Sequence, residues 1–179
     1  MSFNNTANKI TFLRIVLIPV FIVLLYLGLV YLSFAVYIIA CASDIIDGHI
    51  ARKYNQVTDF GKFIDPLADK MLVLSALCYF VETGLVPGWL VAIVLLREFA
   101  VSGLRLLAVK QGIVIAAAPS GKIKTLVTMI AVGTFILVGE PWAPFPQILT
   151  PACIIGILVT TVYSGFDYFI ANRNVFNNK

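Results

Sequence analysis

The sequence predicts an all-α integral membrane protein with six transmembrane helices and both termini in the cytoplasm. The composition and the spacing of the apolar runs carry this prediction. Of the 179 residues, 60% are hydrophobic and only 12% are charged, whereas a soluble domain averages about 25% charged residues. The mean hydropathy is +0.97. So few charges cannot cover the surface of a soluble globule, which argues against a soluble enzyme, a disordered chain and a nucleic-acid binder.

A bilayer-spanning helix needs about 20 mostly apolar residues, and six runs of nearly that length follow one another. They are residues 12–30, 31–47, 66–84, 88–109, 122–139 and 148–171. Glycines and prolines mark breaks between them, as at Gly28, at 84–88 and at 141–146. No linker is long enough to divide the chain. Residues 1–179 are therefore expected to form a single membrane domain.

Lysine and arginine residues predict the orientation of these runs. They gather at the start of the first run, between the second and third, between the fourth and fifth, and after the sixth. The other short loops carry only Glu82 and Glu140. By the positive-inside rule, both termini and both basic loops face the cytoplasm. Arg97 is the exception, because it lies inside the fourth run.

Five of the nine acidic residues fall within 26 positions, from the end of the second run to the start of the third. Asp44 and Asp47 are three positions apart, and Asp65 and Asp69 are four apart, so on helices each pair shares one face. Carboxylates that converge at a membrane boundary repel one another and are costly to desolvate. Oxygen-only ligation suits Mg²⁺ or Mn²⁺, and two such ions can clamp a phosphoryl centre. The fifth acid, Asp59, is expected to be solvated.

Glycine and arginine residues accompany these acids. Gly48 and Gly61 would let a phosphate or nucleotide approach the backbone, and Arg52 offers a forked cation. The alternative is a solvated loop in which the acids balance nearby cations. The spacing of these residues favours a metal- and nucleotide-binding site over a solvated loop. From residue 44 to residue 69 the chain reads Asp-x-x-Asp-Gly-x-x-Ala-Arg, eight residues, then Gly-x-x-x-Asp-x-x-x-Asp, and all eight fixed positions resemble the signature of the CDP-alcohol phosphatidyltransferase family.

This resemblance implies a six-helix membrane enzyme, commonly a homodimer, that transfers a phosphatidyl or related group from a CDP-linked donor to an alcohol and releases CMP. With the orientation given by the cations, the acids are expected on the cytoplasmic side of a multi-pass protein of the cell membrane. The resemblance also implies roles for individual residues. The metal ligands would be Asp44, Asp47, Asp65 and Asp69, and the CDP-binding residues would be Gly48, Arg52 and Gly61. Asp69 would also be the candidate general base. From the residues themselves, four carboxylates can hold two Mg²⁺ or Mn²⁺ ions, and Thr58 is a further candidate for contact with the nucleotide.

Three further segments, residues 8–14, 97–105 and 120–125, resemble family members whose donor is CDP-diacylglycerol and whose acceptor is glycerol 3-phosphate. The residues themselves favour an anionic acceptor, because Arg105, Lys122 and Lys124 can surround a phosphate. The alternative is that these cations only mark topology or contact anionic lipids. Arg97 and Glu98 are adjacent and so are expected to have separate partners. Asp167 is expected to pair with Arg173.

Other functions stay open on the sequence. The same chemistry could use phosphatidylglycerol, inositol phosphate or serine as the acceptor. A divalent-cation transporter would also bind metal through intramembrane acids, although such acids usually lie near the bilayer midplane on several helices. An inactive homologue is disfavoured because all eight signature residues are present.

Overall fold

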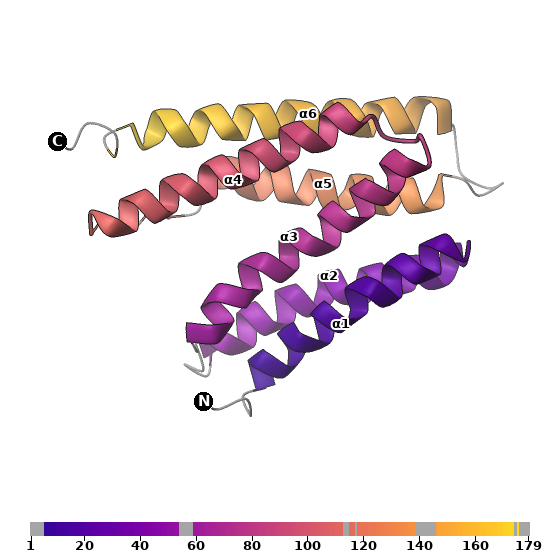
Figure 1. Cartoon of the computed structure of the whole chain (residues 1–179), viewed down its shortest axis with the longest axis horizontal. Coiled ribbons are helices and arrows are strands. Elements are labelled where there is room, and N and C mark those ends of the chain that lie inside the picture. The colour runs from indigo at the N-terminus through magenta and orange to yellow at the C-terminus, as the bar shows by residue number, and fades with distance from the viewer. Residues whose placement is uncertain are drawn as a thin grey trace. The chain divides into compact units, whose positions relative to one another are not determined.

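The structure is a computed structural model that describes residues 6–53, 59–112, 115–116, 118–138, 146–173 and 175. Side-chain surroundings are described for residues 13, 15–43, 70–112, 115–116, 118–138, 147–173 and 175. Within these ranges the chain is all-helical (Figure 1). It forms two compact units, Met1–Tyr79 and Phe80–Lys179. The single domain over residues 1–179 stays a prediction.

The described residues form six α-helices, one on each of the six apolar runs. They are α1 (Thr6–Tyr26), α2 (Val30–Lys53), α3 (Asp59–Glu82), α4 (Gly88–Lys110), α5 (Pro119–Leu137) and α6 (Pro146–Ala171). The largest differences from the predicted runs concern three helices: α3 begins seven residues before 66, α1 begins six residues before 12, and α2 continues six residues past 47. Hydropathy marks only the apolar part of a helix, whereas backbone hydrogen bonding continues through the polar part.

Glycines end two of these helices in the same way. At Gly28 the backbone φ is 70°, a left-handed conformation that glycine adopts without a steric penalty. The Gly28 N–H donates to the Leu25 carbonyl over 3.0 Å, and the Leu29 N–H donates to the Leu24 carbonyl over 3.1 Å. This pairing satisfies carbonyls at the end of α1 that have no partner within the helix. The same pattern ends α3, with Gly84 at a φ of 75°.

In the first unit, α1 packs against α2. The buried rings of Phe21 and Tyr37 lie 5.7 Å apart between their centroids. Tyr79, near the end of the unit, donates a hydrogen bond of 3.1 Å to the Leu25 carbonyl. Its ring also meets the ring of Tyr26 edge-on, at 5.0 Å. These contacts fasten α3 to the end of α1.

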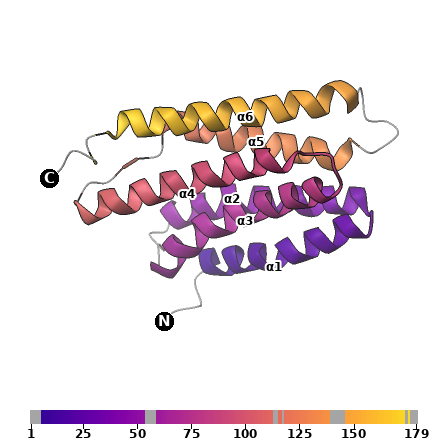
Figure 2. The ribbon, with the colours of Figure 1, turned by 45° about the horizontal axis from the view of Figure 1, so that its top comes forward.

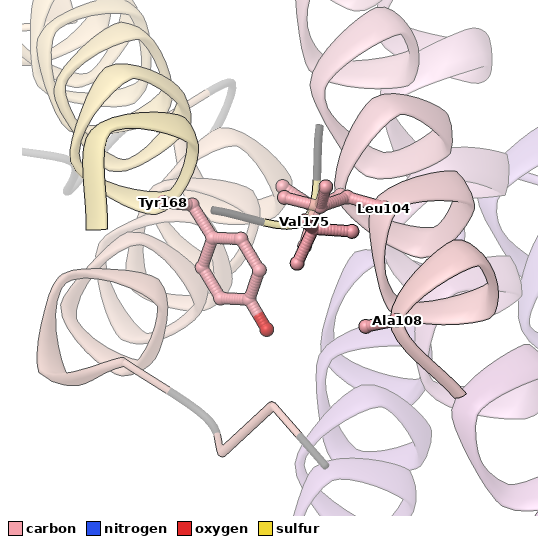
Figure 3. Close-up of a cluster of buried hydrophobic side chains, with 5 residues drawn as sticks. Leu104, Ala108, Tyr168 and Val175 are labelled. Atoms are coloured by element: carbon pink, nitrogen blue, oxygen red, sulfur yellow. The ribbon is translucent and has the colours of Figure 1, made fainter. Parts of the chain in front are cut away.

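In the second unit, α6 packs against both α4 and α5, and it lies alongside them in two views (Figures 1 and 2). The rings of Phe80 and Phe135, 5.5 Å apart, join the end of α3 to α5. One buried cluster forms where α4 ends. It consists of Val101, Leu104 and Ala108 from α4, Tyr168 from α6, and Val175 (Figure 3). Polar side chains also lie inside this three-helix unit, as described below.

Both units expose large apolar side chains. On α4 they include Leu96 and Phe99, and on α6 Phe166 and Ile170. Two helical stretches of the described residues, Pro119–Leu137 and Gln147–Ala171, are long and apolar enough to cross a membrane, while Ile15–Tyr26 and Val30–Ser43 are shorter apolar stretches. Soluble proteins rarely expose large apolar patches to water, so these surfaces fit a lipid environment.

Candidate active site

The eight signature positions all lie on two consecutive helices of the first unit. The last turns of α2 carry positions 44, 47, 48, 51 and 52, and the first turns of α3 carry positions 61, 65 and 69. Positions 44 and 47 are about one turn apart on α2, and so are positions 65 and 69 on α3. The prediction that these acids lie at helical spacing is therefore confirmed for the backbone.

The side chains of these signature residues lie outside the described part of the structure, and Thr58 lies outside the described residues altogether. Among the side chains that the structure describes, no group of three or more His, Cys, Asp or Glu residues comes together. The four aspartates are not among the described side chains, so their role as metal ligands stays a prediction.

The cations expected to bind the acceptor belong to the second unit and have different surroundings. Arg105 and Lys122 are exposed, whereas Lys124 is only 5% exposed. The Lys124 Nζ donates to the Glu98 Oε1 over 2.8 Å, which joins α5 to α4. A buried ammonium group is stable when it is paired and hydrogen-bonded. Lys124 thus has a structural contact that Lys122 lacks among the described residues.

Arg97 and Glu98 contact each other directly, so the prediction of separate partners is wrong. The Arg97 Nη1 donates to the same Glu98 Oε1 over 2.9 Å. Side chains at adjacent helix positions leave the helix in different directions, but the arginine side chain is long enough to reach across to its neighbour. Both side chains are mostly buried, with 11% and 12% exposed. Pairing therefore offsets part of the cost of burying two charges.

Two glycines on neighbouring helices lie against the Arg97 side chain. A Cβ atom added at Gly121 on α5 would lie 3.2 Å from the Arg97 Nη2, and one added at Gly165 on α6 would lie 3.5 Å from the Arg97 Cγ. The arginine side chain therefore runs from α4 past both of the other helices in this unit. Within the described residues its Nε atom is buried without a hydrogen-bond partner.

Two residues of α6 complete this polar region, and the sequence did not reveal either contact. The Tyr168 hydroxyl accepts a hydrogen bond of 2.6 Å from the Arg105 Nε. Asp167 accepts a hydrogen bond from the Ser120 hydroxyl on α5, so the prediction that it pairs with Arg173 is wrong. Arg105 and Tyr168 are 63 positions apart in the sequence, and Ser120 and Asp167 are 47 positions apart. No local spacing could have indicated pairs that the packing of α6 brings together.

The sequence model of CDP-alcohol phosphatidyltransferases matches residues 4–163. The chain belongs to this family. The match includes all eight signature positions and also Arg97, Glu98, Arg105 and Lys124. It ends before Asp167 and Tyr168.

Curated relatives extend the similarity over almost the whole chain. A Bacillus subtilis protein named CDP-diacylglycerol–glycerol-3-phosphate 3-phosphatidyltransferase is 41% identical, over 94% of this chain and 95% of its own length. An Escherichia coli protein of the same name is 33% identical, over 94% and 95% respectively. A Mycobacterium tuberculosis protein named probable phosphatidylglycerophosphate synthase is 37% identical, over 92% of this chain and 79% of its own length.

Proposed function

We propose that this protein transfers a phosphatidyl group from CDP-diacylglycerol to sn-glycerol 3-phosphate, giving phosphatidylglycerophosphate and CMP. This is the reaction of a phosphatidylglycerophosphate synthase, a step in anionic phospholipid biosynthesis. The observation that carries the proposal is the near full-length similarity to relatives with that named activity, together with a complete signature on α2 and α3. Membership of the family alone would support only the transfer chemistry, with the acceptor open.

The first unit supplies the proposed metal and CDP site. CDP-alcohol phosphatidyltransferases generally depend on divalent cations, and the donor set fits that requirement because four carboxylates suit a hard ion. Asp44, Asp47, Asp65 and Asp69 would hold Mg²⁺ or Mn²⁺, with two ions proposed. The bound ions would neutralise charge on the pyrophosphate of the donor. The residues proposed to bind the CDP moiety are Gly48, Arg52, Thr58 and Gly61.

The second unit supplies the proposed site for the acceptor phosphate. Arg105, Lys122 and Lys124 are the proposed ligands, and two structural features support this assignment. Arg105 is exposed near the end of α4, and Lys122 is exposed near the start of α5. Lys124 is held by Glu98, which orders its ammonium group. An uncharged acceptor would not require three cations in addition to Arg52.

In the proposed reaction, Asp69 accepts the proton of the 1-hydroxyl of glycerol 3-phosphate. The hydroxyl oxygen attacks the phosphorus that bears the diacylglycerol. A new phosphorus–oxygen bond forms, and the bond from this phosphorus to the oxygen of the CMP group breaks. Arg52 stabilises the charge on the departing CMP. Catalysis of this kind relies on positioning and electrostatic stabilisation.

We further propose that all six helices cross the cell membrane, with both termini and the active site on the cytoplasmic side. The paired charges of α4 support this topology. Arg97 and Glu98 would be costly in lipid as isolated charges, but they are paired with each other and with Lys124 inside the second unit. A homodimer is proposed from the resemblance to the family.

The experiment that tests the function measures CMP release by purified protein in detergent. CDP-diacylglycerol and Mg²⁺ are supplied with one acceptor at a time: glycerol 3-phosphate, phosphatidylglycerol, inositol phosphate or serine. We expect release only with glycerol 3-phosphate, and we expect EDTA to abolish it and added Mg²⁺ or Mn²⁺ to restore it.

Two other outcomes of this assay would each overturn a different part of the proposal. Release with another acceptor alone would keep the transfer chemistry and overturn the roles of Arg105, Lys122 and Lys124. No release from folded protein, together with metal uptake into proteoliposomes in the absence of any CDP substrate, would favour a transporter instead.

A further inference from the structure

The guanidinium group of Arg105 contacts the side chain of one buried tyrosine, Tyr168, in two ways. Its Nε donates a 2.6 Å hydrogen bond to the Tyr168 hydroxyl, and its Cζ lies 5.4 Å from the centroid of the same ring. The first contact is charge-assisted, which makes it stronger than a neutral hydrogen bond. The second lies within the range of a cation–π interaction. One side chain thus provides two attractive contacts with the guanidinium.

The tyrosine is itself fixed in place. Tyr168 is 1% exposed, and its ring extends from α6 toward Leu104 and Ala108 on α4 (Figure 3). Val175, from the chain after α6, belongs to the same buried cluster. The Tyr168 hydroxyl donates to the Ala116 carbonyl, with 3.4 Å between the two oxygens. With its proton directed there, the oxygen presents its lone pairs to Arg105.

This arrangement leaves the other end of the guanidinium available. Arg105 is exposed, and its only hydrogen bond among the described residues uses Nε. A guanidinium has five N–H donors in a rigid fork, four of them on Nη1 and Nη2. Fixing Nε therefore orients the Nη fork, which matches the oxygens of a phosphate.

We propose that Tyr168 is a positioning residue that holds the Arg105 guanidinium in the orientation in which it binds the phosphate of the acceptor. The inference rests on the proposed function, because it assigns a purpose to Arg105 within that site. Tyr168 touches neither substrate. It lowers the cost of ordering a long, flexible side chain when the acceptor binds.

The test compares Tyr168→Phe with Tyr163→Phe. The first substitution keeps the buried ring and removes only the hydroxyl. The second makes the same chemical change on the same helix, at a side chain that is 64% exposed. We expect Tyr168→Phe to raise KM for glycerol 3-phosphate by about 3- to 10-fold, the size of a side-chain ordering cost. Its kcat and its KM for CDP-diacylglycerol should stay near those of the wild type, and Tyr163→Phe should match the wild type throughout.

A double-mutant cycle with Arg105→Ala shows whether Tyr168 acts through Arg105. We expect Tyr168→Phe to have no further effect on KM once the guanidinium is absent. Where turnover of the double variant is too slow, the rise in Tm caused by glycerol 3-phosphate gives the same comparison.

The inference is overturned by an unchanged KM in Tyr168→Phe, or by an equal effect in the presence and absence of Arg105. It is also overturned if KM for both substrates rises in parallel with a loss of Tm, because a purely structural tyrosine would behave in that way. Wild-type protein that releases no CMP with glycerol 3-phosphate would reject the proposed function, and the inference with it. An active wild type with an unaffected Tyr168→Phe variant would reject the inference alone.

Discussion

The two units of this protein use charged residues in different ways. In the first unit the candidate catalytic charges follow one another along the chain, on the adjoining turns of α2 and α3. In the second unit Arg97, Glu98 and Lys124 come from two helices and pair inside the structure. The acids of the first unit keep a local spacing that the sequence displays, whereas the pairing of Lys124 with Glu98 joins residues 26 positions apart and depends on how two helices pack.

The largest effect we expect is on activity, from Asp69→Asn in the first unit. Loss of a proposed metal ligand and general base should lower the rate of CMP release by about 10²–10⁴-fold or more. Stability should not fall with it. In EDTA, removal of one of several neighbouring negative charges should leave Tm at or above the wild-type value.

Asp59→Asn is the matched control for this prediction, because Asp59 begins the same helix but falls outside the signature. It should retain wild-type activity. Full activity in Asp69→Asn would reject both roles assigned to Asp69. A loss of Tm in EDTA would show that the first unit also depends on its acids for stability, which would remove the contrast between the units.

An intermediate effect is expected on stability, from Lys124→Met in the second unit. The substitution keeps a side chain of similar length but removes the ammonium group that pairs with Glu98. Removing one partner from a buried ionic group is destabilising, and we expect a loss of about 1–3 kcal/mol, seen as a Tm lower by several degrees.

Lys122→Met provides the comparison on the same helix, at an exposed position. Its Tm should stay near that of the wild type, because surface substitutions usually change stability by less than about 0.5 kcal/mol. Both variants should raise KM for glycerol 3-phosphate if both lysines bind the acceptor. Equal Tm values for the two variants would show that the buried ion pair with Glu98 contributes no net stability.

The smallest effect concerns the space around Arg97. Gly103→Ala on α4 meets no atom within 4 Å, so it should stabilise the helix by about 0.5–1 kcal/mol. Gly121→Ala places a methyl group 3.2 Å from the Arg97 Nη2, and the ion pair with Glu98 resists movement of that group. We expect its Tm to lie roughly 1–3 °C below that of Gly103→Ala. Thermal unfolding in detergent measures both, and equal Tm values would mean that Arg97 moves freely.

The sequence predicted much of the fold because helices are local structures. Apolar runs located all six helices, and Gly28 and Gly84 marked the ends of α1 and α3. The prediction was less accurate at the start of α1, the end of α2 and the start of α3, since these polar ends are helical but carry no hydropathy signal. The family was also predictable, because the spacing from Asp44 to Asp69 lies within one continuous segment.

The contacts of the second unit were not predictable in this way. The sequence identified Arg97, Glu98, Arg105 and Lys124 as notable charges but did not show which of them contact each other. It wrongly predicted separate partners for Arg97 and Glu98, and a pair between Asp167 and Arg173. The actual contacts depend on side-chain length, on burial, and on helices that meet only after the chain folds. Tyr168 carried no local signal at all.

By itself, then, the sequence determined the all-helical class, the signature and the family, because each depends on residues within a few helical turns of one another. Only the tertiary structure decided that Glu98 binds both Arg97 and Lys124, that Ser120 donates to Asp167, and that Tyr168 holds Arg105. The reason is physical. A buried polar group needs a partner, and the packing of α4, α5 and α6 selects which of the available groups comes within hydrogen-bonding distance.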